Sequence, residues 1–195
     1  NGMTLAFDPN PNVFEILVLN AKLNLDKTNI RPYNYAIAEK PGKYYYNSSE
    51  ATFDNGGISK KQKNKHGKYQ LENKVTAVNL LNFLKDNPDI NLDKLSFIKV
   101  DVEGLDFEIL RSIKDIISTY RPIIIAECFK KLNNGIRDNL FLLFMDLDFV
   151  CFKLEEFDGN EVLEKLYKKE DMRNWEHFDF CMIPKEKSAG FHDDH

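Results

Sequence analysis

Short apolar runs alternate with helical apolar patterns along the chain. Residues 4–7 form an apolar run that is closed by turn-forming residues at 8–11, which predicts a buried strand. Apolar side chains then recur at helical spacing over 13–23, and Asn10 stands where an N-cap is expected. A second strand is predicted over 30–38. The chain therefore opens as strand, helix and strand.

The same alternation is stronger in the second half of the chain. A strand is predicted over 95–100, a turn at 101–104 and a helix over 105–120, which ends before an Arg-Pro pair. An apolar strand then runs to Glu127. Further predicted elements are a hairpin from Gly42, a strand over 75–78, helices over 80–84 and 135–147, and strands over 149–154 and 178–183. This order predicts an α/β fold with a mostly parallel sheet.

Composition and charge narrow the classes of function. The chain has 195 residues, 43% hydrophobic and 30% charged, which is typical of one globular domain over 1–195. Its net charge of −4 argues against a nucleic-acid partner. No apolar run approaches the ~18 residues that would cross a bilayer, so no membrane partner is expected. A lysine-rich stretch predicts a mobile basic loop over 54–70, and residues 186–195 read as a tail.

The three cysteines bear on the cellular compartment. Cys128, Cys151 and Cys181 each lie in an apolar run, and their spacing is not that of a metal site. They are therefore interpreted as reduced, buried thiols. No secretion signal is visible, and together these features predict a cytoplasmic protein.

Carboxylates follow the predicted strands at the end of the sheet where α/β folds bind ligands. Asp8 follows the first strand, Asp101 and Glu103 follow the strand over 95–100, and Glu127 ends the next strand. Asp8 could cap a helix or bind a ribose diol. Asp101 and Glu103 could be charges at a helix N-terminus or functional groups, and Glu127 could form a structural salt bridge or contact a substrate.

These residues carry a resemblance to a known family. The block Phe-Ile-Lys-Val-Asp-Val-Glu-Gly at 97–104, with the Arg-Pro pair at 121–122 and the strand that ends in Glu127, resembles the FkbM family of S-adenosylmethionine-dependent methyltransferases. The block at 6–11 is similar to a second conserved block of that family, which more often has Glu where this chain has Asp8. The resemblance covers roughly residues 4–183.

The resemblance implies a fold and a cofactor site. The implied fold is a Rossmann-like class I methyltransferase sheet, mostly parallel with an antiparallel C-terminal strand. Asp8 would bind the ribose of S-adenosylmethionine with Asn10 near it, and the backbone around Ala36 would lie beside the adenine. The family's first strand and glycine loop would precede Asn1 and are expected to be missing here.

The resemblance also implies an acceptor site. Asp101 would face both cofactor and acceptor, and Glu103 and Glu127 would be candidates for acceptor binding, general base or metal coordination. Asp101 is the first candidate for removing the acceptor's proton and Glu103 the second, whereas a lone His177 is more often a packing or surface group. Acids alone do not specify a metal, so none is assigned.

The predicted function is therefore O-methylation of a hydroxyl on a sugar, a glycan or a related small metabolite. One alternative is a non-catalytic remnant or interaction module that keeps the sheet without a working cofactor loop. Another is a nucleotide-sugar-binding enzyme of different chemistry. A missing first strand would leave sheet edges open, so a homodimer is also expected.

Overall fold

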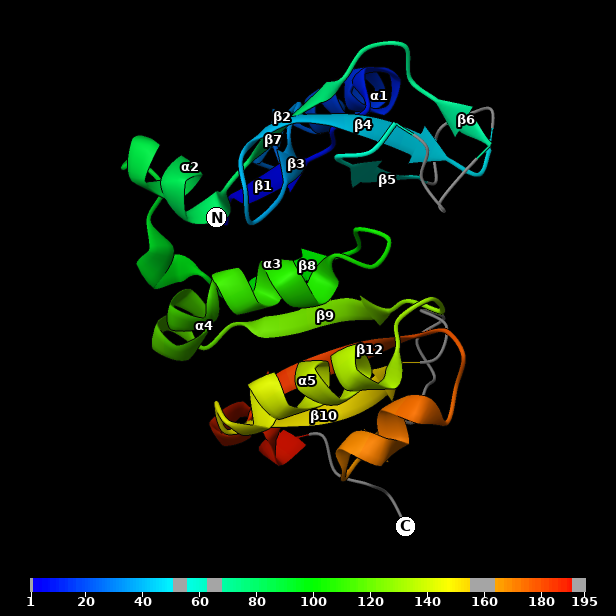
Figure 1. Ribbon diagram of the computed structural model, residues 1–195. Helices are drawn as coiled ribbons and strands as arrows, with labels where there is room; N and C mark the ends of the chain where they lie inside the picture. The colour runs from blue at the N-terminus through cyan, green and yellow to red at the C-terminus, as the bar shows by residue number, and fades with distance from the viewer. Residues whose placement is uncertain (1, 51–55, 63–67, 155–163, 191–195) are drawn as a thin grey trace. The chain divides into compact units, whose positions relative to one another are not determined.

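The computed structural model describes residues 2–50, 56–62, 68–154 and 164–190, which form a mixed α/β arrangement (Figure 1). The chain divides into two compact units, 1–90 and 91–195. Five α-helices and three sheets are present over the described residues. The mixed α/β class is confirmed, and the single methyltransferase-like domain over 1–195 stays a prediction.

The first unit opens with the predicted strand, helix and strand. Strands β1 (Thr4–Phe7) and β2 (Ile30–Tyr33) pair in parallel, and helix α1 (Pro11–Lys22) connects them. The side chain of Asn10 caps α1, because its Oδ1 accepts from the Asn12 N–H at 3.0 Å. The rings of Phe7, Tyr33 and Phe83 pack together with centroids 4.8–5.2 Å apart. This aromatic cluster fixes helix α2 (Leu80–Asp86) on the β1/β2 pair.

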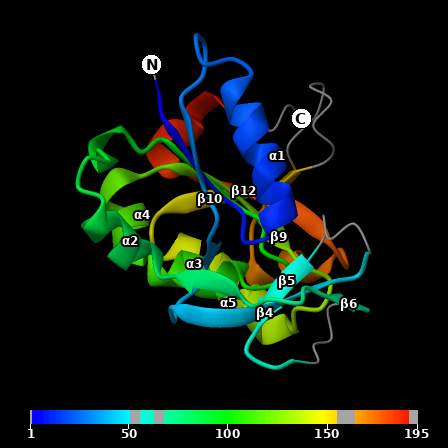
Figure 2. The ribbon, with the colours of Figure 1, turned by 90° about the horizontal axis from the view of Figure 1, so that it is seen from above.

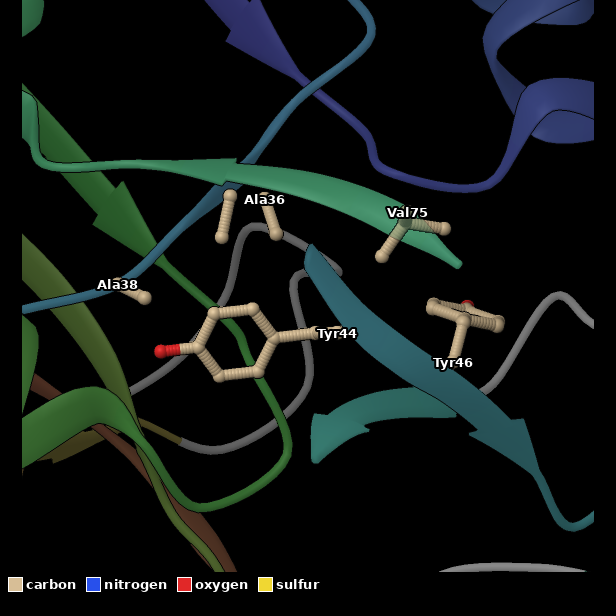
Figure 3. Packing of buried hydrophobic residues seen from close by; sticks show 6 residues of the cluster. Ala36, Ala38, Tyr44, Tyr46 and Val75 are labelled. Atoms are coloured by element: carbon tan, nitrogen blue, oxygen red, sulfur yellow. The ribbon is translucent and has the colours of Figure 1, made fainter. Parts of the chain in front are cut away.

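A second sheet in this unit is built around a tyrosine-rich strand. Its members are β3 (Ala36–Ile37), β4 (Gly42–Ser48), β5 (Gly56–Ser59), β6 (Tyr69–Gln70) and β7 (Val75–Val78). Their order is β3-β7-β4-β5, and β6 also pairs with β4. Tyr44 and Tyr46 lie on one face of β4 and pack with Ala36 and Val75 in a small buried core (Figure 3).

The segment 54–70 differs from the expected loop. Strands β5 and β6 lie inside it, and the Nζ of Lys60 lies 3.8 Å from the centre of the Tyr44 ring. Residues 54–55 and 63–67 of this basic segment lie outside the described residues. The sequence pattern did not predict strand β5 because Gly56-Gly57 shows no alternation of apolar and polar side chains. The strand forms because its backbone pairs with β4.

The second unit is one sheet covered by helices. Its strands are β8 (Phe97–Val100), β9 (Ile123–Cys128), β10 (Phe149–Leu154), β11 (Glu164–Leu166) and β12 (Phe178–Pro184), in the order β11-β10-β12-β9-β8. The α-helices are α3 (Asp106–Ser112), α4 (Lys114–Tyr120) and α5 (Asn134–Met145), and the 3₁₀ helices are η1 (Leu92–Lys94), η2 (Lys169–Arg173) and η3 (Lys185–Gly190). Helix α3 packs against β9 and α5, and α5 packs against β10 (Figure 2).

The strand register determines which face of this sheet carries acidic side chains. Ala126 on β9 pairs with Phe180 on β12, and both side chains are buried. The neighbouring pair, Glu127 and Asp179, points to the opposite face, since successive side chains in a strand alternate. The register therefore fixes which face carries the carboxylates.

Two sequence predictions about this unit need correction. The sheet is not mostly parallel, because only β8 and β9 pair in parallel here and the last three strands run antiparallel to their neighbours. The antiparallel C-terminal strand is confirmed. The single helix expected over 105–120 is interrupted at Ile113, where the Ser112 hydroxyl donates to the Ile109 carbonyl at 2.7 Å.

None of the described helices is long and apolar enough to cross a membrane. Cys128, Cys151 and Cys181 are free and buried, as the sequence predicted.

A buried arginine connects α5 to the chain that precedes β12. Arg137 is only 5% exposed, and its guanidinium donates to the backbone carbonyls of Phe129, Leu132, Met172, Trp175 and Glu176. Five N–H groups meet five carbonyl oxygens, so all of the guanidinium's hydrogen-bonding capacity is used. The guanidinium therefore holds the carbonyls of Met172, Trp175 and Glu176 to α5.

Replacing Arg137 with Met should lower the free energy of unfolding by on the order of 3 kcal/mol, because buried carbonyls would lose charged donors. Urea unfolding followed by circular dichroism measures this loss. Arg173→Met is the matched control, since Arg173 forms a surface ion pair with Asp138 and its replacement should cost much less. Equal losses of unfolding free energy in the two variants would contradict the larger contribution assigned to the buried hydrogen bonds of Arg137.

Candidate functional site

The turn between β8 and α3 carries two of the candidate residues in an unusual backbone conformation. Glu103 has a φ of 55° and Gly104 a φ of 98°, so two consecutive residues are left-handed. A non-glycine residue adopts this conformation at an energetic cost. A Cβ on Gly104 would lie 3.0 Å from Cδ1 of Phe129, so the loop also passes close to the segment after β9. Glycine is therefore required there for both reasons.

Asp101 begins this turn directly after β8. Its Oδ2 lies 3.5 Å from the Nζ of Lys99, and both side chains are about half exposed. This is a solvent-facing ion pair, which contributes little to stability. Asp101 is therefore accessible to a ligand.

Glu127 occupies a different environment at the end of β9. The residue is 7% exposed, and its Oε1 lies 3.3 Å from Nε2 of His177. Its Oε2 is buried and has no hydrogen-bond partner among the described residues. A buried carboxylate oxygen without a donor is costly, so this group is held in place for a reason other than local stability.

The carboxyl groups around Glu127 raise one another's pKa values. We call Asp101, Glu103, Asp106, Glu127 and Asp179 the acidic edge. Burial, and then the charges of Glu103 and Asp101, raise the pKa of Glu127 to about 8. Burial and Asp101 likewise raise the pKa of Glu103 and of Asp179. The sequence prediction that Asp101, Glu103 and Glu127 lie near one another is supported by this mutual influence.

Asp106, the first residue of α3, belongs to the same edge. Its carboxyl is fully buried, and its Oδ2 accepts from the Gly104 N–H at 3.3 Å. Burial raises the pKa of Asp106 to about 6. Local sequence pattern does not reveal this burial, because the position follows a turn and opens a helix.

Asp8 is placed by the first unit. Its Oδ1 accepts from the Asn10 N–H at 2.8 Å, and the side chain of Asn34 donates to its carbonyl at 3.0 Å. Burial raises the pKa of Asp8, and the Asn10 N–H opposes that shift. Asn10, not Asp8, caps α1, so the capping alternative for Asp8 does not apply. Its Oδ2 has no hydrogen-bond partner among the described residues and can accept from a ligand.

Two further residues predicted to bind the cofactor, Asn10 and Ala36, are buried in the first unit. The Asn10 side chain is fully buried at the start of α1. Ala36 is buried against Tyr44 and Val75, which leaves its backbone in β3 as the part that a ligand could reach (Figure 3). Asp8, Asn10 and Ala36 belong to the first unit and the acidic edge to the second, so a shared crevice stays a prediction.

The sequence predicted a packing or surface role for His177. It reaches Glu127 because β12 pairs antiparallel with β9, and only that long-range pairing could have revealed the contact. Within the described ranges, no three His, Cys, Asp or Glu side chains are arranged to hold a metal ion.

Comparison with known proteins identifies the family. The profile described as the methyltransferase FkbM domain matches residues 1–169. The chain belongs to the FkbM methyltransferase family. Membership implies methyl transfer from S-adenosylmethionine. The turn at 101–104 and the residues of the acidic edge other than Asp179 lie within the matched region. Searches of curated proteins and of solved structures gave no match.

The raised pKa of Glu127 predicts a pH dependence of stability. A carboxyl whose folded pKa lies above its unfolded value binds more protons in the folded state, so stability is lost as pH rises toward the folded value. Asp106 contributes below about pH 6, and Glu127 up to about pH 8. The free energy of unfolding should therefore fall by on the order of 2 kcal/mol between pH 6 and 8.

Glu127→Gln should remove most of this slope and should be more stable than the wild type at pH 8. Urea unfolding at pH 6, 7 and 8 measures it, with Glu186→Gln as the control, because Glu186 is an exposed acid whose pKa is lowered. An unchanged slope in Glu127→Gln would rule out Glu127 as its origin.

Proposed function

We propose that this protein is an S-adenosylmethionine-dependent O-methyltransferase that acts on a hydroxyl of a sugar or related small metabolite, including a glycan. The acidic edge carries the proposal, because it places accessible and buried carboxylates after two neighbouring parallel strands, β8 and β9. Ligands of α/β proteins bind beyond that end of parallel strands. Family membership supports the methyl donor.

The first unit offers a fit to the nucleoside part of the donor. A carboxylate that follows a strand can accept two hydrogen bonds from a ribose diol, and Oδ2 of Asp8 has an open acceptor position. Asn10 supports Asp8 by donating its N–H, and the backbone at Ala36 is proposed to lie beside the adenine. When bound, S-adenosylmethionine supplies a methyl group already activated by its sulfonium centre.

The residues of the acidic edge then supply position and charge. A hydroxyl acceptor must approach the methyl group in line and must lose its proton. Asp101 is the accessible carboxylate and is proposed to contact the acceptor, with Glu103 as the second contact. Glu127 is more buried, and its carboxylate is proposed to contribute to the electrostatic potential around Asp101 and Glu103.

The charge of the edge favours a class of acceptor. Carboxylates accept hydrogen bonds from vicinal hydroxyl groups, whereas a concentration of negative charge repels phosphorylated or acidic molecules. A neutral polyhydroxyl compound such as a sugar fits both conditions.

The fold supports the same proposal. Two strand-helix-strand segments, β1-α1-β2 and β8-α3-α4-β9, each pair in parallel. We propose that each is a unit of the Rossmann-like kind found in methyltransferases. The free, buried cysteines support a cytoplasmic location.

An interaction module is the second candidate, and one observation favours it. Helix α1 and the following turn expose large apolar side chains, namely Ile16, Leu19, Leu23 and Leu25. Such exposure is typical of a surface that is covered by another chain or segment.

The cofactor proposal is tested by calorimetric binding of S-adenosylhomocysteine to the full-length protein. Asp8→Asn keeps the contact with the Asn10 N–H but loses the charge, so binding should weaken at least tenfold, or about 1.4 kcal/mol. Asp26→Asn, an exposed acid in the same unit, should leave binding unchanged. Failure of the wild-type protein to bind would favour the interaction module.

The acceptor class is tested with the tritiated-methyl donor and a panel of neutral sugars, phosphorylated sugars and acidic glycans. Label should appear on neutral sugars. Transfer only to phosphorylated or acidic compounds would contradict the proposed acceptor class.

We also propose a homodimer through the apolar surface of α1. Leu19→Glu combined with Leu23→Glu should convert a dimer to a monomer in multi-angle light scattering, because two charges would enter an apolar contact. A wild-type monomer at micromolar concentration would refute the dimer.

A further inference from the structure

We propose that His177 accepts the proton of the acceptor hydroxyl, and that Glu127 positions the imidazole and balances its charge. The inference rests on the proposed methyl transfer to a hydroxyl group. It assigns the proton to a residue outside the carboxylates Asp101 and Glu103.

The two ring nitrogens of His177 have different surroundings. Nε2 of His177 lies 3.3 Å from Oε1 of Glu127, whose side chain is 9% exposed, whereas the His177 side chain is 49% exposed. The ring also meets Phe129 edge to face, with centroids 6.2 Å apart. Among the described residues, Nδ1 has no hydrogen-bond partner and is directed away from the carboxylate that binds Nε2.

A carboxylate on one imidazole nitrogen selects the state that a base needs. An ionised Glu127 at 3.3 Å from Nε2 favours the imidazole tautomer with its proton on Nε2, which leaves the lone pair on Nδ1. The same carboxylate stabilises the imidazolium that forms after proton transfer. Asp101 has no comparable partner, because its neighbour is the half-exposed Lys99.

The backbone that carries His177 is fixed independently of any ligand. Trp175 and Glu176, the two residues before it, both give their carbonyls to the buried guanidinium of Arg137. On the other side, Phe178 pairs with Cys128 in the sheet. The backbone on both sides of His177 is therefore fixed by hydrogen bonds, as a residue that must be positioned for catalysis requires.

The step conserves atoms and charge. The acceptor oxygen forms a bond to the methyl carbon while the bond between that carbon and the sulfonium sulfur breaks, and its electron pair stays on the sulfur. The hydroxyl proton moves to Nδ1 of His177. One positive charge leaves the sulfur, and one appears on the imidazolium beside Glu127.

Charged groups of both signs surround the pair. The acids are Asp101, Glu103, Asp106 and Asp179, and the bases are Lys99, Lys130 and Lys131. Burial and these acids raise the pKa of Glu127 to about 8, so its ionised form becomes abundant near that pH.

A titration of the imidazole carbon and nitrogen shifts by NMR tests the pair without an acceptor. His177 is assigned by comparison with His177→Gln. We expect the His177 signals of the wild type to respond to the titration of Glu127 near pH 8, and this response to be absent in Glu127→Gln. Asp179→Asn, which removes a neighbouring charge but not the contact, should keep the response. Identical titrations in wild type and Glu127→Gln would overturn the pairing.

A kinetic test addresses proton transfer with the best neutral sugar from the acceptor panel. His177→Ala should lose about 100-fold or more in kcat at pH 8, within the range of general-base catalysis, and added imidazole should restore part of it. S-adenosylhomocysteine binding should be unchanged, which separates this result from failure of the cofactor proposal. Unchanged kcat in His177→Ala, or a loss that added imidazole does not rescue, would overturn the role of His177.

Discussion

The second unit depends on one buried cation that binds no carboxylate. Arg137 uses its guanidinium to join five backbone carbonyls from the segment after β9 and from the irregular chain before β12. These carbonyls lie outside the sheet ladders, and each gains a charged donor from Arg137; the Phe129 carbonyl also accepts from the Leu132 N–H at 3.0 Å. A neutral side chain could not satisfy all five, and lysine lacks the planar arrangement of donors. The path of the chain into β12, and with it the position of His177, follows from this contact.

The acidic edge runs against ordinary stability rules in two ways. Glu127 buries an oxygen without a partner, and Glu103 adopts a left-handed backbone conformation that costs free energy. Several carboxyl pKa values are raised at the same place, which means that burial outweighs the attraction of the nearby lysines. Strain and unfavourable electrostatics gathered at one end of a sheet are typical of a functional site.

Much of this arrangement followed from local pattern, and the rest did not. Asp101, Glu103 and Glu127 could be predicted because each follows an apolar run, and the ends of parallel strands meet at one edge. The burial of Asp106, the break at Ile113 and the contact between His177 and Glu127 depend on packing between distant segments. The antiparallel return of β12 decides the last of these, and no local periodicity encodes the register of two strands separated by 50 residues.

The environment of Glu127 has opposite consequences for stability and for proton transfer. Burial makes the protonated carboxyl the stable form, so ionising it weakens the folded state as pH rises toward 8. Ionised Glu127 is the form that can accept from Nε2–H and leave Nδ1 of His177 ready to take a proton. The free energy stored in the buried charge is released when the neighbouring imidazole becomes positive. A site of this kind is least stable in the state that is ready to react, and it regains stability as the proton arrives.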